Sequence, residues 1–90
     1  MTYKTALISP HTIYRTDSFN ALQAVKHAAR KWVEEVLPEH LDSAHLLFVV
    51  MEINHSNEVE RFVCLPFQWP QLGEILGTIG AFFESPSTLG

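Results

Sequence analysis

The residues best suited to chemistry in this 90-residue chain are its five histidines, because neutral imidazole is the commonest metal ligand in proteins. They are His11, His27, His40, His45 and His55. Their spacing does not fit a metal site, since no two follow the H-x3-H or H-E-x-x-H pattern. His40 and His45 are five residues apart with Asp42 between them, and would converge on a metal only if that loop curled. The sequence therefore predicts no metal site and no cofactor.

A nucleophilic cysteine is the next possibility, and the chain has a single cysteine, Cys64. It lies between Val63 and Leu65 in an apolar run, where a buried and unreactive thiol is expected. Glu52 and His55 could form an acid/base pair, but they lie on opposite sides of a strand end. We therefore expect a protein that is not an enzyme.

Three of the four glycines fall in the segment LGEILGTIGAFF, residues 72–83, whose apolar residues are spaced like those of a helix. Gly73, Gly77 and Gly80 match neither a phosphate loop nor the dinucleotide pattern G-x-G-x-x-G. Each glycine costs a helix interior up to about 1 kcal/mol relative to alanine. We expect another backbone to approach this strip closely, either from the protein's own sheet or first helix or from a partner. Alternatively, the glycines break the helix and form a loop.

Basic residues on the first predicted helix suggest an alternative function, nucleic-acid binding. Lys26, Arg30 and Lys31 lie on its exposed side, but Glu34 and Glu35 follow at i+4 and would partly neutralise them. The whole chain has ten acidic and six basic residues, for a formal net charge of −4. Nucleic-acid binding would therefore be weak and salt-sensitive, which makes it the second choice.

Hydrophobic periodicity and turn signals predict the element order β-α-β-β-α. A first strand covers residues 3–9, and residues 46–53 and 59–67 form an antiparallel hairpin. Between them a helix starts at N-cap candidates Thr16, Asp17 or Ser18 and ends at Pro38. Its predicted apolar face consists of Phe19, Leu22, Val25, Ala29, Trp32, Val33 and Val36. A second helix starts after Trp69-Pro70 and ends at Ser85-Pro86.

These elements predict one α+β domain, residues 1–90, with residues 85–90 as a flexible tail. A three-stranded, mainly antiparallel sheet carries two helices packed on one face. Every residue from Leu46 to Met51 is apolar, so both faces of this strand need a cover. If the helices cover one face, the other face is left without a cover. That face is formed either by Leu46, Phe48 and Val50 or by Leu47, Val49 and Met51. A partner subunit is the simplest cover.

Composition completes the functional prediction. One cysteine excludes an internal disulfide and fits a reducing compartment, and no apolar run is long enough to span a bilayer or to form a signal peptide. We expect a cytoplasmic, non-catalytic protein–protein interaction module, such as a regulator, inhibitor or accessory factor, that forms a homodimer and contacts an unidentified protein partner. The predicted contact residues are Trp69, Gly73, Gly77, Gly80 and Phe83, together with the uncovered face of Leu46 to Met51.

Overall fold

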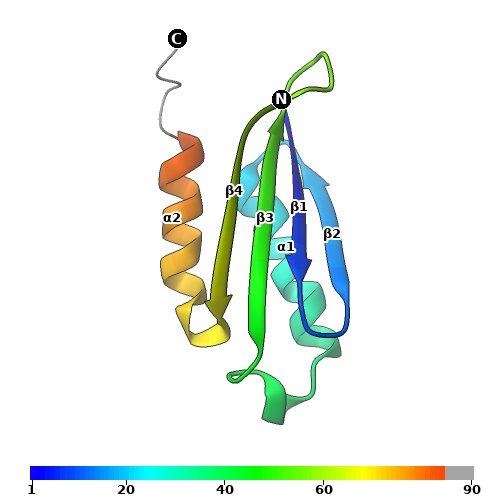
Figure 1. Cartoon of the computed structure of the whole chain (residues 1–90), viewed down its shortest axis with the longest axis vertical. Helices are drawn as coiled ribbons and strands as arrows, with labels where there is room; N and C mark the ends of the chain where they lie inside the picture. The colour runs from blue at the N-terminus through cyan, green and yellow to red at the C-terminus, as the bar shows by residue number, and fades with distance from the viewer. Residues whose placement is uncertain (85–90) are drawn as a thin grey trace.

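The apolar segment His45–Ile53 forms a central strand of a four-stranded antiparallel sheet. The computed structural model describes residues 1–84, and within them the strands are β1 (Thr2–Ile8), β2 (Ile13–Ser18), β3 (His45–Ile53) and β4 (Val59–Gln68). They lie in the order β2-β1-β3-β4 (Figure 1). Because β3 pairs with a strand on either side, the most apolar strand also has its backbone groups satisfied. The predicted tail, residues 85–90, lies outside the described residues.

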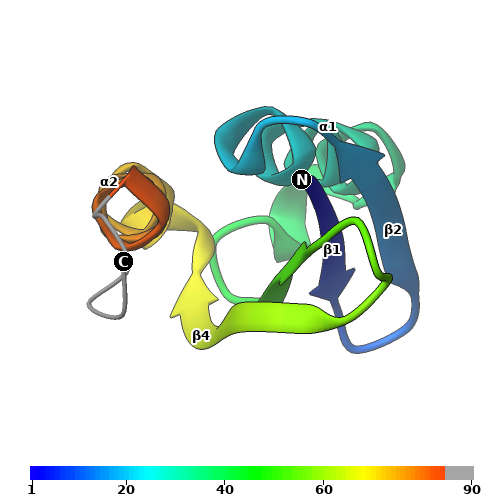
Figure 2. The same cartoon turned by 90° about the horizontal axis from the view of Figure 1, so that it is seen from above.

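Two α-helices lie on the same side of this sheet in the described part of the chain (Figure 2). Helix α1 (Ala21–Glu35) covers β1 and β2, while α2 (Leu72–Glu84) lies along the β4 edge and also contacts α1. Two short 3-10 helices, η1 (Pro38–His40) and η2 (Trp69–Gln71), precede β3 and α2. The predicted α+β class, with an antiparallel sheet and two helices, is confirmed.

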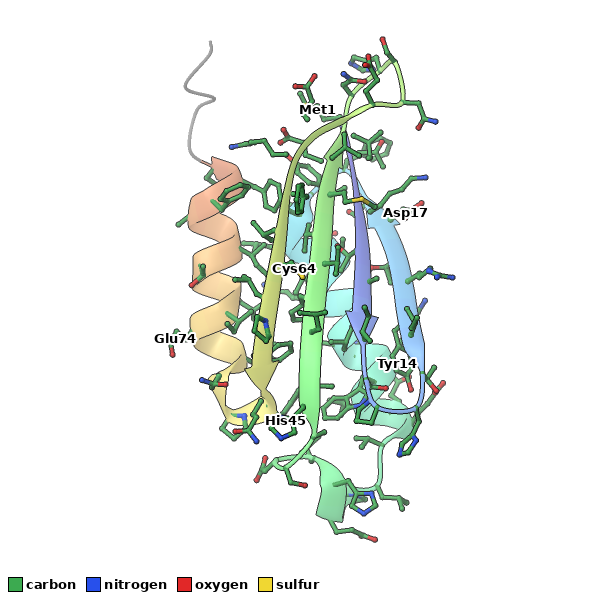
Figure 3. All side chains as sticks on the ribbon, in the orientation of Figure 1. Met1, Tyr14, Asp17, His45, Cys64 and Glu74 are labelled. Carbon is green, nitrogen blue, oxygen red and sulfur yellow. The ribbon has the colours of Figure 1, made fainter. Side chains whose placement is uncertain are left out.

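The prediction of three strands was wrong, because residues 13–18 form β2 and not a connection. A tight turn places this segment beside β1: the backbone N–H of Ser9 donates to the carbonyl of Thr12 at 2.9 Å, and Ile8 pairs with Ile13. Tyr14 and Asp17 are both on this strand (Figure 3). The observed element order is therefore β-β-α-β-β-α.

The start of α1 consequently differs from the prediction. Thr16, Asp17 and Ser18 belong to β2, and the N-cap is Asn20, whose side-chain oxygen accepts a hydrogen bond from the backbone N–H of Gln23 at 3.1 Å. Asn is among the preferred N-cap residues because it can satisfy an N–H group that has no partner within the helix. The pairing of residues 13–18 with β1 delays the helix to Ala21.

The buried face of α1 is also narrower than predicted. It consists of Ala21, Ala24, Val25, Ala28, Ala29 and Trp32. Phe19 precedes the helix and is 86% exposed, and Val33 is 40% exposed, so both were wrongly placed in the core. The alanines allow the helix axis to approach the sheet closely, while Leu22 and Val36 are half-buried and pack against the core.

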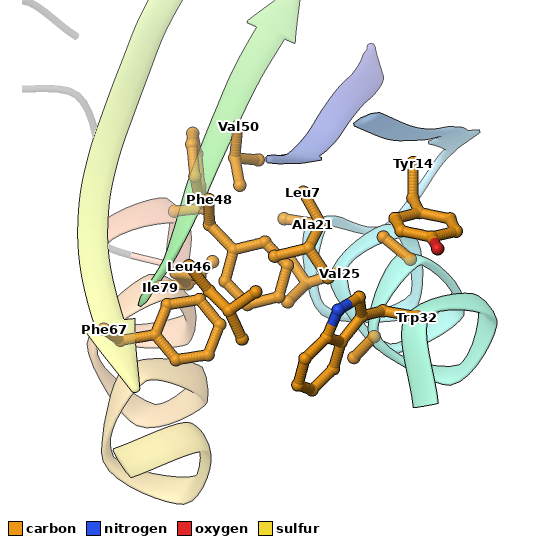
Figure 4. Close-up of a cluster of buried hydrophobic side chains, with 13 residues drawn as sticks. Leu7, Tyr14, Ala21, Val25, Trp32, Leu46, Phe48, Val50, Phe67 and Ile79 are labelled. Atoms are coloured by element: carbon orange, nitrogen blue, oxygen red, sulfur yellow. The ribbon is translucent and has the colours of Figure 1, made fainter. Parts of the chain in front are cut away.

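The hydrophobic core fills the space between the sheet and the two helices (Figure 4). Phe48 of β3 is fully buried, and its ring stacks on that of Phe67 with 4.8 Å between centroids. Val25 of α1 and Ile79 of α2 close over the same strands. Core packing of this face turns every second residue of β3 inward and the intervening residues outward.

Candidate functional site

The outer side of the sheet has no cover from residues 1–84, because both helices lie on the opposite side (Figure 2). Antiparallel pairing arranges its side chains in three rows that cross all four strands. The first row is Ile13, Ile8, Leu47 and Pro66; the second is Arg15, Ala6, Val49 and Cys64; the third is Asp17, Lys4, Met51 and Phe62. We call these residues the open face.

Large apolar groups are accessible across this open face. Phe62 is 63% exposed and Ile13 is 48% exposed, while Leu47, Val49 and Met51 are half-buried by their neighbours alone. The prediction that one side of this strand lacks a cover within the chain is therefore confirmed for the described residues. Contiguous apolar surface of this kind marks interaction sites in soluble proteins.

A hollow of about 760 Å³ extends from the open face, over β2, β1 and β3, round the β2 edge towards α1. On the open face its apolar floor is formed by Ala6, Val49 and Met51 and its polar lining by Lys4, Arg15 and Asp17, while His27 and Lys31 line it from α1. Lysine and arginine thus outnumber the single acidic group. The combination favours a ligand that is apolar and that also interacts well with cations.

The glycines of α2 have different surroundings. Gly73 and Gly77 are exposed, and a Cβ atom added to either would meet no described atom within 4 Å. Gly80 is buried against α1, and a Cβ there would lie 3.4 Å from Leu22 Cδ1. Gly80 therefore lies in contact with α1 at a distance close to ordinary van der Waals contact, whereas Gly73 and Gly77 remain available to a partner.

The two predicted aromatic contact residues pack within the protein. Phe83 is 8% exposed, and its ring meets that of Tyr3 edge to face with 5.3 Å between centroids. Trp69 is half-buried and lies against Trp32 with a centroid distance of 4.9 Å. Phe83 therefore contributes to the core, while Trp69 fixes the start of α2 against α1.

An ion pair on the covered side of the sheet was missed by sequence reasoning. The guanidinium of Arg61 donates to Glu52 through Nε to Oε1 at 3.1 Å and through Nη2 to Oε2 at 2.9 Å. It also donates to the carbonyls of Phe82 and Phe83 at 3.0 and 3.1 Å. The last carbonyls of a helix have no N–H partner within the helix, and a cationic side chain such as that of Arg61 donates hydrogen bonds to them. Arg61 thus joins β3, β4 and the end of α2.

The chemistry of this pair is structural. Hydrogen bonding from Arg61 lowers the pKa of Glu52 despite the opposing effect of burial, and the hydroxyl of Tyr3 also donates to this carboxylate at 2.9 Å. Burial, followed by the contact with Glu52, raises the pKa of Tyr3. A carboxylate kept ionised and occupied by donors is a poor proton acceptor. The sequence did show an acidic residue and a basic residue on two adjacent apolar strands. Whether their side chains meet depends on the register of those strands, which the sequence does not give.

The remaining predicted chemical groups are dispersed over the surface. Cys64 is exposed on the open face, so its predicted burial was wrong: Val63 and Leu65 face the core, and the residue between them must face outward. All five histidines are exposed, and no three His, Cys, Asp or Glu side chains of residues 1–84 are grouped to hold a metal ion. Neither α1 nor α2 has the length and apolar character needed to cross a membrane.

The basic residues of the alternative prediction lie on the outer side of α1. Lys26, Arg30 and Lys31 are all exposed. Lys31 reaches the β2 edge, where its Nζ donates to the carbonyl of Arg15 at 3.4 Å, and it lines the hollow. The carboxylate of Glu35 accepts a hydrogen bond from the Tyr14 hydroxyl at 2.7 Å.

Comparison with known proteins identifies no relative. No protein-family model, curated protein or solved structure matches the chain significantly. Functional interpretation therefore depends on the open face and the residues around it.

Proposed function

We propose that this protein is a non-catalytic protein–protein interaction module, and that two copies form a homodimer by packing their open faces together. The observation that carries this proposal is the apolar surface centred on Leu47, Val49 and Met51, which the described residues leave without a cover. Packing two such faces at the usual separation of about 10 Å would remove these side chains from water.

The size of the open face suits this role. Four strands spaced about 4.8 Å apart, each with about seven residues of about 3.4 Å, span roughly 19 by 24 Å. Two copies would cover about 900 Å² of flat area, and side-chain relief brings the buried accessible surface towards the roughly 1,200 Å² at which specific interfaces begin. This area is at the low end for specific interfaces, where association is weak, so we expect a dimer that dissociates at concentrations of about micromolar or above.

The dimer would leave both helices of each copy on its outside. The exposed strip around Gly73 and Gly77 would remain accessible to a further protein, as expected for a regulator, an inhibitor or an accessory factor.

The proposed location of the protein is the cytoplasm. The free thiol of Cys64 fits this compartment, because thiols are kept reduced there.

Sedimentation velocity over a range of about 1 to 200 µM tests the proposal, because a micromolar dimer changes its mass across that range. Val49→Glu places a charge at the centre of the open face and should abolish association. Val33→Glu makes the same change on the outer side of α1 and should leave association intact. Cys64→Arg, at an exposed position of the same row as Val49, should also abolish association with less risk to folding.

Circular dichroism should show native secondary structure in all three variants. A wild-type chain that stays monomeric at the highest concentration would exclude the homodimer. Equal association of the Val49→Glu and Val33→Glu variants would exclude the open face as its contact surface.

A second function, weak nucleic-acid binding, is supported by the position of Lys31 between the basic side of α1 and the hollow. Changing Lys26, Arg30 and Lys31 together to glutamate should then abolish binding of a labelled oligonucleotide, measured by fluorescence anisotropy at low and moderate salt. No binding by the wild-type chain at low salt would exclude this function.

A further inference from the structure

The open face carries both a projection and a depression. Phe62 projects from the edge strand β4 and is 63% exposed. The hollow lies towards the other edge, over β2, β1 and β3, and is lined by Lys4, Arg15 and Met51 among others. A two-fold symmetric dimer can fill two such hollows with two such projections, because both partners contribute the same surface.

We propose that Phe62 of each copy inserts into the hollow of the other, around a two-fold axis that runs parallel to the strands. This inference rests on the proposed homodimer and adds its arrangement. An axis in this direction places β4 of one copy over β2 of the other and keeps each row opposite the same row. Phe62 then lies over the Asp17–Lys4 part of the third row, where the hollow is.

The competing arrangement has its axis perpendicular to the strands. With that axis through the middle row, β4 would lie over β4 and the third row over the first row, so that Phe62 faces Pro66 of the second copy and lies away from the hollow. With the axis through the middle row, Arg15 would also face Arg15 of the second copy. In the arrangement we propose, these two guanidinium groups are separated sideways by three strand spacings, about 14 Å.

The chemistry of the hollow matches an aromatic ring. Ala6, Val49 and Met51 provide an apolar floor, and a methionine sulfur packs favourably at a ring edge. Lys4 and Arg15 provide cations that the negative face of the ring attracts. A purely aliphatic side chain would contact only the floor, whereas the ring of Phe62 would also interact with these cations, so Phe62 suits the hollow better.

Crosslinking between two different chains distinguishes the arrangements. In the proposed dimer, position 15 of one copy faces Cys64 of the other, because both lie at the ends of the middle row. One chain carries Arg15→Cys with Cys64→Ser, and the other is wild type. A short bismaleimide is the suitable reagent, since packed sheets are about 10 Å apart and a disulfide needs Cα atoms within about 7 Å.

The mixture should give a crosslinked dimer, whereas each chain alone should give none, because like positions are about 14 Å apart sideways. Crosslinking of wild type alone, through Cys64 of both copies, would overturn the inference and leave the homodimer standing. A dimer that crosslinks in no combination would overturn it as well. A wild-type monomer at all concentrations would instead refute the proposed homodimer, and oligonucleotide binding by that monomer would assign the hollow to nucleic acid.

Phe62→Ala provides an independent measurement. We expect its dimer dissociation constant to rise about tenfold, as for an aromatic side chain that fills a pocket of the partner. Phe19→Ala is the matched control, because Phe19 is 86% exposed but lies outside the open face, and its dissociation constant should equal that of wild type. Equal affinities for the two variants would overturn the inference.

Discussion

Replacing Gly77 with alanine tests why the second helix carries three glycines. Gly77 is exposed in the interior of α2, and an added Cβ would meet no described atom within 4 Å. Alanine is more favourable than glycine in a helix interior by up to about 1 kcal/mol, since its backbone loses less entropy on folding. We therefore expect Gly77→Ala to raise the free energy of unfolding by about 1 kcal/mol, which corresponds to about 4–8 °C in Tm for a domain of this size.

Urea denaturation followed by circular dichroism measures this change, with Gly80→Ala as the comparison. The new methyl group of Gly80→Ala would lie 3.4 Å from Leu22 Cδ1, at the close limit of ordinary van der Waals contact, so the gain should be no larger than for Gly77→Ala. A Gly77→Ala variant less stable than wild type would refute the reasoning, because the described chain offers nothing for the methyl group to strike. Higher stability together with weaker protein association would show that the exposed glycine contacts a partner.

Two further predictions concern the covered side of the sheet. Because Arg61 lowers the pKa of Glu52 in the folded state, the carboxylate stabilises the fold above its ordinary pKa of 4.5 and this contribution is lost as the pH falls through the lowered value. Glu52→Gln should therefore lose less stability than wild type on acidification in urea titrations, and parallel pH profiles would contradict this. Thr5→Val removes a buried hydroxyl that has no hydrogen-bond partner among the described residues, and should raise the free energy of unfolding by about 1 kcal/mol. Thr16→Val removes a 2.6 Å hydrogen bond to the carbonyl of Ala24 and should lower it by about 1 kcal/mol; equal effects of the two substitutions would contradict the assignment.

The elements that sequence reasoning predicted correctly are those with strong local patterns. The continuous apolar run around Phe48 became β3, and the following run became its antiparallel neighbour β4. Both helices exist, and α2 remains helical through its glycines. Periodicity identifies such elements because side-chain direction repeats every two residues in a strand and every 3.6 in a helix.

The second strand was missed because its residues are mostly polar. Its sequence from Ile13 to Ser18 contains helix-capping residue types, and a single segment offers no sign of the strand it will pair with. Its hydrogen bonds to β1 are formed only after the chain reverses at Pro10 and His11. Phe19 and Val33 were misplaced for a related reason, since hydrophobicity alone does not reveal that alanines will form the contact between α1 and the sheet.

By itself, the sequence determined that both faces of β3 would be apolar, because every residue from Leu46 to Met51 is apolar and a strand exposes alternate residues on opposite sides. Only the tertiary structure decided that Leu47, Val49 and Met51 are the uncovered ones, since this depends on the side to which α1 and α2 attach. It also decided the pairing of Glu52 with Arg61 and the outward position of Cys64. These features follow from strand register and from the choice of sheet face, which depend on contacts between residues far apart in the chain.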